Sequence, residues 1–534
     1  MKTPKILQTD YLVIGSGLSG LYFAHHASKH GKVTIISKKK IIDSTSYLAQ
    51  AGIASVLSKE DSQKSHIEDT IRTGAGLSNR KIVEMVVSEG PDRIRDFIEN
   101  FGVSFTRQED GSLDLGLEGG HSKRRVVHVD DFTGKSLINT IKEKVKNNPN
   151  IEIFENTMAV DLLSMSKYNK PNSCFGAFVI QPDSIDINII IARATILATG
   201  GAGKVYNYSS NPDTAVGDGI AMAYRIGAQV SNMEFIQFHP TILYHHQAKS
   251  FLISEALRGE GGILRLNDGT AFMSKYSERA ELASRDIVAR AIDSELKISG
   301  EDCVFLDMTH LDGEFLKGRF PNIYKNCLKY GVDFTKDPIP VVPAAHYTCG
   351  GIQTNKNGRT TVNNLFAIGE SAHTGMHGAC RLASNSLLEA VVFGYRASQA
   401  VKDCKMSRPR TIIPWKSEKA VSSDEGVVVT HNWDEIRRTM WNYVGIVRSD
   451  KRLKRANTRI KMIREEIHKY YWDFLVTAEV IELRNLALVA DIIIHGASRR
   501  LESRGLHYNI DHQERSSFYL KNTVLERGNG PAHT

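Results

Sequence analysis

The stretch YLVIGSGLSG, residues 11–20, decides the fold of this chain. YLVI is a short apolar run typical of a buried strand, and the residues after it place Leu21, Ala24 and Ala27 on one helical face. VTII, residues 33–36, has the character of a second strand. Strand, GxGxxG, helix and strand in this order predict a βαβ unit that binds a dinucleotide.

The three glycines have separate predicted roles. Gly15 allows the tight turn, Gly17 lets the backbone approach a pyrophosphate, and Gly20 lets helix and strand pack closely. The helix N-terminus then presents free N–H groups to the phosphates. The second strand ends at Ser37, where NAD-binding proteins usually have an Asp or Glu for the ribose, so NAD is disfavoured. Ser37 could still bond a ribose hydroxyl, and the lysines at 38–40 could equally form a solvated turn.

Two further segments have the pattern of the same nucleotide-binding domain. ATILATGGAG, residues 194–203, is a buried strand that runs into glycines, and NLFAIGE, residues 364–370, is a strand with an acid at its end. Strands and glycines at three places indicate a cofactor longer than a mononucleotide, lying across the sheet. The chain between about 236 and 345 is then an insertion that leaves the sheet and returns to it.

The composition is that of an ordinary globular protein. The 534 residues are 41% hydrophobic and 24% charged, which favours two or three domains, and the net charge of +8 does not require nucleic acid. The six cysteines form no CxxC pair, so we expect reduced thiols in a cytoplasmic protein, without a metal or iron–sulfur site. No apolar run is long enough to span a membrane.

After about residue 403 the pattern changes to a linker and then to helices. Pro409, Pro414 and an SSDEG run indicate the linker. Residues 447–472 follow with a basic face, which is either a solvated helix face or an RNA-binding surface. A second helix is expected after about residue 483, and the polar end of the chain is expected to be frayed. The apolar residues of the first helix, at helical spacing, are Leu453, Ala456, Ile460, Ile463 and Ile467.

Ordered segments from residue 15 to 508 resemble the succinate dehydrogenase and fumarate reductase flavoproteins. The segments are GSGLSG, STSYLAQAGIAS, EGGHSKRRVVHVDDFTG, ATGGAG, GDGIAMAYRIGA, MEFIQFHPT, SEALRGEGG, SRDIVARAI, PAAHYTCGGI, NLFAIGE, GACRLASNSLLE and ESRGLHY. The resemblance implies an α/β fold with a Rossmann-like FAD-binding domain, an inserted α+β capping domain and a C-terminal helical domain. The implied boundaries are 1–235 and 346–405 for the FAD-binding domain, 236–345 for the capping domain, 406–430 for a linker, and 431–534 for the helical domain with its polar tail.

The resemblance implies FAD as the cofactor. The succinate dehydrogenase branch attaches its flavin covalently through a histidine, and this chain has Thr45 at that position, so the FAD should be noncovalent. Ala51 replaces the first glycine of the usual AQGG motif, and its methyl group can shift that loop slightly. The implied cofactor residues are Gly15, Ser16, Gly17, Leu18, Ser19, Gly20, Ser37, Lys38, Ser44, Thr45, Ser46, Tyr47, Leu48, Ala49, Gln50, Ala51, Gly52, Ala198, Thr199, Gly200, Asp218, Glu370, Arg381, Ser386 and Leu387.

The same resemblance implies a site for a small dicarboxylate. Arginine suits such a ligand because its planar fork grips a carboxylate with two hydrogen bonds. The residues implied around the substrate are Arg285, Arg381, His239 and His346, with Ser254, Glu255 and Arg258 nearby. Arg285 is the implied proton-transferring group. Ser284 and Cys380 depart from the Pro and Asn that the family more often has, and each flanks one of these arginines.

The loop EGGHSKRRVVHVDDFTG, residues 118–134, adds one carboxylate, Glu118, in front of several basic residues. Its form resembles the branch of the family that oxidises L-aspartate. Aspartate differs from succinate by an ammonium group, so Glu118 would pair with that cation and repel succinate. The alternative is a structural ion pair between Glu118 and Arg124 or Arg125, within a polar surface loop.

The resemblance therefore implies oxidation of L-aspartate to iminoaspartate, with oxygen giving hydrogen peroxide or fumarate giving succinate. This would be the first step of de novo NAD biosynthesis through quinolinate, with quinolinate synthase as functional partner and a monomer or weak dimer as the assembly. One alternative is a fumarate reductase or succinate dehydrogenase flavoprotein subunit, which needs an electron-carrying partner. The other is an FAD-binding protein that contacts RNA, whose RNA affinity would fall steeply with salt.

Overall fold

The computed structural model describes residues 4–168, 171–181, 184, 186–248, 251–415 and 426–528. Strand β1 (Ile6–Ile14), helix α1 (Leu18–Ala27) and strand β2 (Val33–Ile36) form the predicted βαβ unit. β1 and β2 are parallel, with Tyr11 opposite Val33 and Ile14 opposite Ile36. The unit forms because β2 and the second half of β1, residues 11–14, are buried and mostly apolar, and glycines separate the first strand from the helix.

The βαβ unit is part of a mixed sheet with the order β6-β2-β1-β9-β8-β7, in which β16 also pairs with β9. β6, β2, β1, β9 and β16 are parallel, while β8 runs antiparallel to both of its neighbours. The predicted strands at 194–203 and 364–370 are therefore confirmed as members of one sheet. The remaining bounds are β6 (Ile151–Phe154), β7 (Met158–Ser164), β8 (Cys174–Ile180), β9 (Asn188–Leu197) and β16 (Leu365–Ala367).

Helices pack on both faces of this sheet. One core joins the sheet to α1, α3 (Arg80–Asp96), α4 (Thr133–Lys146) and α10 (Asn385–Ala400). The other core joins it to α5 (Asp218–Arg225) and to the C-terminal helices. Helix α2 (Gln63–Thr73) and a small sheet of β3 (Ile53–Ala54), β4 (Leu115–Gly116) and β5 (Val126–Val127) lie beside the first core.

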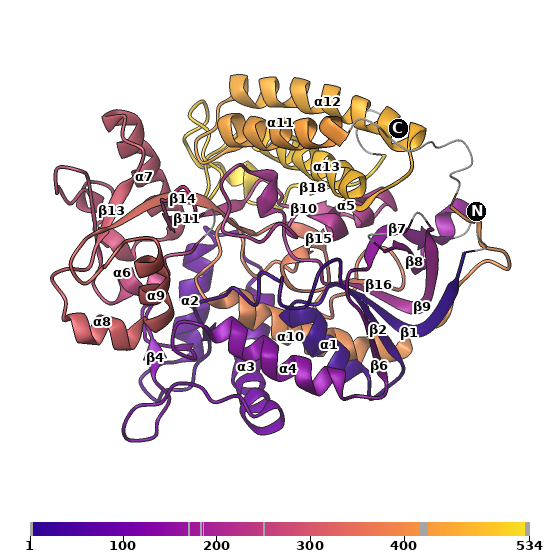
Figure 1. Cartoon of the computed structure of the whole chain (residues 1–534), viewed down its shortest axis with the longest axis horizontal. Coiled ribbons are helices and arrows are strands. Elements are labelled where there is room, and N and C mark those ends of the chain that lie inside the picture. Colours follow the sequence, from indigo (N-terminus) through magenta and orange to yellow (C-terminus); the bar gives the residue numbers. More distant parts are fainter. Residues whose placement is uncertain are drawn as a thin grey trace.

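The predicted insertion forms a unit with its own antiparallel sheet, in the order β11-β14-β13-β12, and its own apolar core. β11 (Ile236–Leu243) leads into this unit and β14 (Ile339–Thr348) returns from it, and the two strands pair antiparallel, with register shifts after Gln237 and after His239. Figure 1 shows the unit at the left of the molecule. Its other elements are α6 (Glu255–Gly259), β12 (Ile263–Arg265), α7 (Arg285–Ser299), β13 (Val304–Asp307), α8 (Gly313–Arg319) and α9 (Pro321–Lys329).

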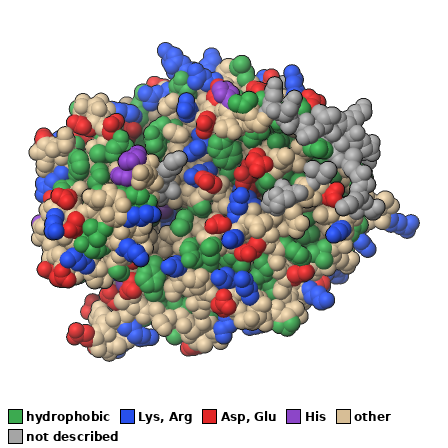
Figure 2. All heavy atoms as spheres, viewed as in Figure 1, with side chains coloured by type: hydrophobic (Ala, Val, Ile, Leu, Met, Phe, Trp, Pro, Cys, Tyr) green, Lys and Arg blue, Asp and Glu red, His purple; other side chains and the backbone are tan. Residues whose placement is uncertain are grey.

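Three long helices, α11 (Gly426–Val444), α12 (Asp450–Asp473) and α13 (Ala478–Arg499), form the C-terminal layer at the top of Figure 1. The five apolar residues predicted on one face of α12 are all buried against its neighbours. Helix α11 begins inside the segment 406–430 predicted as a linker, and part of that segment lies outside the described residues. Figure 2 shows basic side chains along the upper edge, where α12 lies, and side chains of both charges over the rest of this face.

The expectation of a frayed chain end is wrong for the residues described up to 528. β18 (Val524–Leu525) is the edge strand of a second sheet and pairs with β10 (Val230–Ser231). The order of that sheet is β17-β15-β10-β18, with β15 at Gly351–Gln353 and β17 at Ala372–His373. The physical reason is Arg500, which is 1% exposed and needs buried acceptors. Its guanidinium pairs with Glu234 at 2.7 Å and Glu502 at 2.9 Å, and it donates to backbone carbonyls of Tyr519 and Lys521, each at 2.8 Å.

No helix within the described ranges is both long enough and apolar enough to cross a membrane.

Replacing Arg500 by Met should strongly destabilise the fold, because Glu234 would remain buried without its cation. We expect a loss of about 3–5 kcal/mol in the free energy of unfolding, as for other broken buried ion pairs. Chemical denaturation followed by circular dichroism measures this loss. The matched control is Arg499→Met, at the exposed neighbouring position, which should change stability by no more than about 0.5 kcal/mol. Equal unfolding midpoints for the two variants would show that the Arg500 network is not stabilising.

Candidate active site

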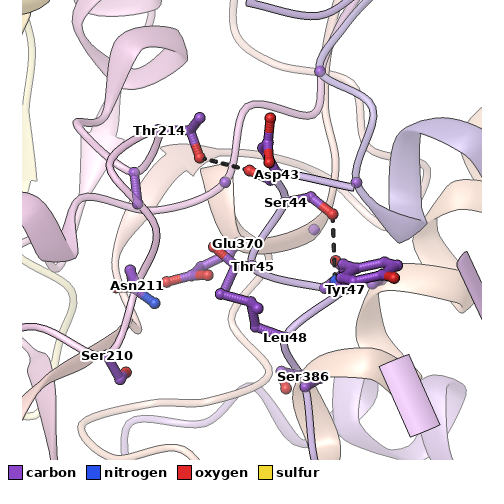
Figure 3. A pocket seen from close by; sticks show the side chains of 18 of the residues that line it. Asp43, Ser44, Thr45, Tyr47, Leu48, Ser210, Asn211, Thr214, Glu370 and Ser386 are labelled. Carbon is purple, nitrogen blue, oxygen red and sulfur yellow. Dashed lines mark hydrogen bonds between the residues drawn. The ribbon is translucent and has the colours of Figure 1, made fainter. Parts of the chain in front are cut away.

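A cavity of about 510 Å³ lies between the large sheet and the inserted unit. Its wall begins at the glycine turn after β1 and continues to the arginines of α7 and of the loop before α10. Figure 3 shows part of this wall, where the loop from Asp43 to Leu48 lies near Ser210, Asn211 and Glu370. A cavity that has the glycine turn in one part of its wall and arginines in another can hold a large cofactor and a small anion together.

The glycine turn has the geometry that each predicted role requires. A Cβ at Gly15, whose φ is +114°, would lie 2.1 Å from the carbonyl oxygen of Ala198, and one at Gly20 would lie 2.3 Å from the carbonyl oxygen of Gly15. A Cβ at Gly17 would meet only the Ser46 hydroxyl, at 3.4 Å, so this backbone is open to a ligand. These residues fit a pyrophosphate approaching the N-terminus of α1.

The loop that carries residues 44–52 is anchored at several points. The Thr214 hydroxyl donates to the carbonyl of Asp43 at 3.1 Å, and the N–H of Tyr47 donates to the Ser44 hydroxyl at 3.3 Å, as Figure 3 shows. The Gln50 amide donates to the carbonyl of Leu252 in the inserted unit at 2.7 Å, and its own oxygen is buried without a partner. An unpartnered buried acceptor in this wall is consistent with a bound cofactor that supplies a donor.

Most of the predicted cofactor residues line the cavity. The exceptions are Leu18, whose side chain is in the sheet core while its N–H donates to Ser46 at 3.2 Å, and Gly20, which packs against Gly15. The predicted residues in the wall are Gly15, Ser16, Gly17, Ser19, Ser37, Lys38, residues 44–52, Ala198, Thr199, Gly200, Asp218, Glu370, Arg381, Ser386 and Leu387. Glu370 accepts from the N–H of Thr348 at 2.9 Å, and burial raises the pKa of its carboxyl to about 7.

The cationic end of the cavity contains two buried arginines that share one acceptor. The Gln237 side-chain oxygen accepts from Arg285 Nη1 at 2.9 Å and from Arg381 Nη2 at 2.9 Å. The Gln237 amide nitrogen donates to the carbonyl of Arg381 at 2.9 Å, which fixes the orientation of the amide. Arg381 also donates to the Ser386 hydroxyl at 2.8 Å and lies over the Tyr347 ring at 4.2 Å. Burial and Arg285 lower the pKa of Arg381.

Glu255 links Arg285 to a second buried arginine, Arg258. Its carboxylate lies 2.5 Å from Arg285 Nε and 3.1 Å from Arg258 Nη2. Burial by itself would raise the pKa of Glu255, but the two arginines outweigh burial and lower it, so the carboxylate is charged. Arg258 does not line the cavity, and it donates to the carbonyl of Glu281 at 2.7 Å. An arginine–carboxylate–arginine chain therefore runs from the cavity into the inserted unit.

His239 and His346 face each other at the same end, with ring centroids 5.0 Å apart. Burial and the nearby arginines lower the pKa of both imidazoles well below the usual value, so both are neutral at pH 7. His239 Nδ1 lies 3.2 Å from both the N–H and the carbonyl oxygen of Thr241, and its Nε2 is a buried atom without a protein partner. His346 Nδ1 bonds the Ser210 hydroxyl at 2.6 Å. The site therefore offers neutral donors beside the two arginines.

Glu118 is 2% exposed and lies one hydrogen bond behind the cavity wall. The Ser384 hydroxyl, which lines the cavity, donates to Glu118 Oε2 at 2.6 Å. Burial and Glu255 raise the pKa of Glu118, against the opposing effects of Ser384, Arg285 and Arg381. Ser384 has a left-handed φ of +56°, uncommon for a residue with a side chain and often found at functional sites.

The alternative ion pairs for Glu118 are wrong, because both candidate arginines have other partners. Arg124 lies 3.6 Å from Glu260, and Arg125 is fully buried between Asp61 at 2.8 Å and Asp69 at 2.6 Å. The expectation of a polar surface loop is also wrong at this end of the segment, because Glu118 and Arg125 are buried.

Sequence reasoning missed Gln237, Ser384 and Ser210 as site residues. A signal existed for Gln237, because residues i and i+2 of a strand point to the same face and His239 was already a candidate. Ser384 and Ser210 have no local signal, since their roles come from contacts with Glu118 and His346, which are distant in the chain. The departures at Ser284 and Cys380 both contact Asp286: the Ser284 hydroxyl donates to it at 2.5 Å, and Cys380 Sγ lies 3.8 Å away.

Comparisons with known proteins agree with this architecture. The family model described as an FAD binding domain matches residues 10–387, and the one described as the fumarate reductase flavoprotein C-terminal region matches residues 433–532. The chain is 51% identical to L-aspartate oxidase 1 of Ralstonia nicotianae, over 98% of both chains. It is 49% identical to L-aspartate oxidase of Pseudomonas aeruginosa, over 95% of this chain and 96% of the relative. A solved structure of quinol fumarate reductase from E. coli superposes with a TM-score of 0.88 at 29% identity, covering 97% of this chain and 94% of the other.

Replacing Gln237 by Leu should weaken binding of a four-carbon dicarboxylate. The substitution removes the acceptor shared by Arg285 and Arg381, and leaves buried guanidinium donors unpaired. We expect the dissociation constant for succinate, measured by calorimetry, to rise about ten- to a hundredfold. Gln247→Leu, at an exposed position, is the control and should leave the constant unchanged. Unchanged succinate affinity in Gln237→Leu would show that the arginines hold their positions without this amide.

Proposed function

We propose the function of this chain from one premise: it belongs to the flavoprotein family of the succinate dehydrogenases and fumarate reductases. It catalyses the FAD-dependent oxidation of L-aspartate to iminoaspartate, the first step of de novo NAD biosynthesis through quinolinate. Oxygen accepts the electrons to give hydrogen peroxide, or fumarate accepts them to give succinate. The observation that carries this function is a cavity that joins a dinucleotide turn to two buried arginines, with a buried carboxylate one hydrogen bond behind its wall.

Bound FAD would supply the hydride acceptor for Cα of the substrate. The glycine turn and the loop of residues 44–52 would hold it, because both line the cavity and keep backbone open toward a ligand. Thr45 has no nitrogen that could form the histidyl link found in the dehydrogenase branch. The chain therefore uses noncovalent FAD.

Arg381, His239 and His346 anchor the two carboxylates of the substrate. Arg381 is held by Gln237 and Ser386, so its fork is oriented before the substrate arrives. His239 Nε2 is buried without a protein partner, and in the tautomer with its proton on Nε2 it would donate to a substrate carboxylate. Neutral imidazoles donate to the anion without adding further cations beside the two arginines.

Arg285 is the group that holds and moves a proton at the reacting carbon when fumarate is reduced. Its Nε bonds Glu255, and Glu255 in turn pairs with Arg258. A chain of charged groups linked by short hydrogen bonds can resupply a proton to a guanidinium that has donated one. In aspartate oxidation the demand on Arg285 is smaller, and there it positions and polarises the substrate.

Glu118 recognises the substrate ammonium through Ser384. The Ser384 hydroxyl donates a hydrogen bond to Glu118, so its oxygen lone pairs remain free to accept a hydrogen bond from an ammonium group in the cavity. A bound ammonium would oppose the effects of burial and Glu255, which raise the pKa of Glu118, because opposite charges interact strongly in a low-dielectric site. Succinate and fumarate have no ammonium group, so the Glu118 charge would weaken their binding while the arginines still hold their carboxylates.

The product also suggests a partner and a location. An imine beside a carboxylate hydrolyses in water, so an enzyme that consumes iminoaspartate should act soon after it forms. We propose quinolinate synthase as that functional partner, in the cytoplasm, where the six thiols stay reduced. We propose a monomer or a weak dimer as the assembly.

Purified, FAD-loaded protein should turn over L-aspartate and not succinate when dye reduction is followed, with peroxide formed from oxygen. The reason is the Glu118–Ser384 pair, which has a partner in the ammonium of aspartate only. Turnover of succinate alone would assign the chain to the dehydrogenase branch instead.

Replacing Glu118 by Gln should lower kcat/KM for aspartate oxidation about ten- to a hundredfold, because the ammonium loses its anionic partner. Fumarate reduction involves no ammonium, so its rate should change far less in the same preparation. Glu109→Gln is a control at an exposed position that lies outside the cavity wall. An equal loss in both reactions would reject the recognition role and leave Glu118 with a structural one.

A further inference from the structure

Helix α13 of the C-terminal layer reaches the cofactor cavity through an ion-pair cluster. Lys38, which lines the cavity, has its ammonium 2.7 Å from Asp218 Oδ2 and 2.6 Å from Glu482 Oε1. Asp218 also lines the cavity, whereas Glu482 belongs to α13 and does not. All three side chains are largely buried: the exposed fraction is 15% for Lys38, 9% for Asp218 and 21% for Glu482. A residue of the C-terminal layer thus holds a residue of the cofactor wall.

A second contact connects α13 to Asp218. The Asn485 amide donates to Asp218 Oδ1 at 2.8 Å, while the Asn485 oxygen accepts from Arg225 at 2.7 Å. Asn485 is fully buried, and both of its amide atoms have partners. Asp218 therefore has one oxygen held by Lys38 and the other by α13. Its carboxylate cannot rotate without breaking one of these bonds.

The backbone that places Asp218 also packs on α13. Gly217, immediately before α5, has a φ of +82°, and a Cβ at this position would lie 2.9 Å from a methyl group of Val489. Val489 is one turn further along α13 than Asn485. The absence of a side chain at Gly217 therefore allows the turn before α5 to pack closely on α13. This packing is independent of the charges.

The cluster is suited to positioning rather than to attracting an anion. Two carboxylates offset the one ammonium, so the cluster offers no excess positive charge to the pyrophosphate of FAD. Burial, and to a lesser extent Asp218, raise the pKa of Glu482, against the opposing effect of Lys38. Burial would lower the pKa of Lys38, but Asp218 and Glu482 outweigh burial and raise it, so the ammonium stays charged. Because Asp218 and Glu482 both hold its ammonium, the Lys38 side chain has a fixed position in the cavity wall and is not free to move toward the ligand.

We propose that α13 supports the cofactor site: its residues Glu482 and Asn485 are positioning residues that hold Lys38 and Asp218 in place for FAD. It follows that FAD binding and docking of α13 stabilise each other, because coupling between two equilibria is reciprocal. This inference rests on the FAD dependence of the proposed function.

Glu482→Gln tests the inference through cofactor affinity. The FAD dissociation constant of the apoprotein, measured by quenching of flavin fluorescence, should rise at least tenfold. The KM for L-aspartate at saturating FAD should stay within twofold, because Glu482 is outside the cavity wall. Glu479→Gln, an exposed position on the same helix, is the matched control and should bind FAD like the wild type. Adding Glu482→Gln to a Lys38→Met protein should cause little further loss, since Glu482 acts through Lys38.

Hydrogen exchange supplies a readout that does not depend on activity. Amides of residues 478–490 in α13 should exchange more slowly in the FAD-loaded wild type than in its apoprotein, and Glu482→Gln should reduce this protection. If Glu482→Gln does not fold by circular dichroism, Asn485→Ala carries the same expectations. A dissociation constant for FAD that is unchanged or lower in the variant would overturn the inference. A lower constant would identify Lys38 as a cation that binds the FAD phosphates. Failure of the wild type to bind FAD would instead contradict the proposed function.

Discussion

The structure depends on keeping two arginines, Arg285 and Arg381, charged and close together inside the protein. Like charges in a buried site repel strongly, so each guanidinium needs an acceptor that does not move. Gln237 supplies one acceptor to both, and Glu255 supplies a charge to Arg285. These partners come from a strand and a helix of the inserted unit, while Arg381 comes from the loop before α10. The insertion is therefore required for the chemistry as well as for covering the cavity.

Both histidines predicted to contact the substrate lie on the strand pair β11–β14 of the inserted unit. His239 lies on the outgoing strand and His346 on the returning one, and the antiparallel ladder brings their rings to 5.0 Å. Gln237 lies two residues before His239 and therefore on the same face of β11. The two predicted substrate histidines and the amide that bonds both arginines are thus positioned by one strand pair. Small motions of this pair would move all three together.

Much of the fold followed from sequence because its signals are local. The βαβ unit, the strands at 194–203 and 364–370, and the buried face of α12 are each encoded by neighbouring residues, and all are present. The partners of Glu118 and Arg125 could not be predicted this way, because they are distant in the chain: Ser384 bonds Glu118, while Asp61 and Asp69 pair with Arg125. The ordered C-terminal end was missed for the same reason. Its polar residues are local signals for fraying, but they supply acceptors to the distant, buried Arg500.

The contact between Lys38 and Glu482 joins the beginning of the chain to its end, and this has a consequence for synthesis. The glycine turn and β2 leave the ribosome early, whereas α13 follows most of the other elements. Domains generally fold as they emerge, N-terminal parts first, so the residues that line the cavity, the last of which is Ala390, can be in place before α13 has been made. Glu482 and Asn485, which hold Lys38 and Asp218 from behind the wall, follow only when nearly the whole polypeptide has been made. A nascent chain would thus fix its flavin site at the end of translation, and a product truncated before α13 would have the cavity without the residues that hold its wall.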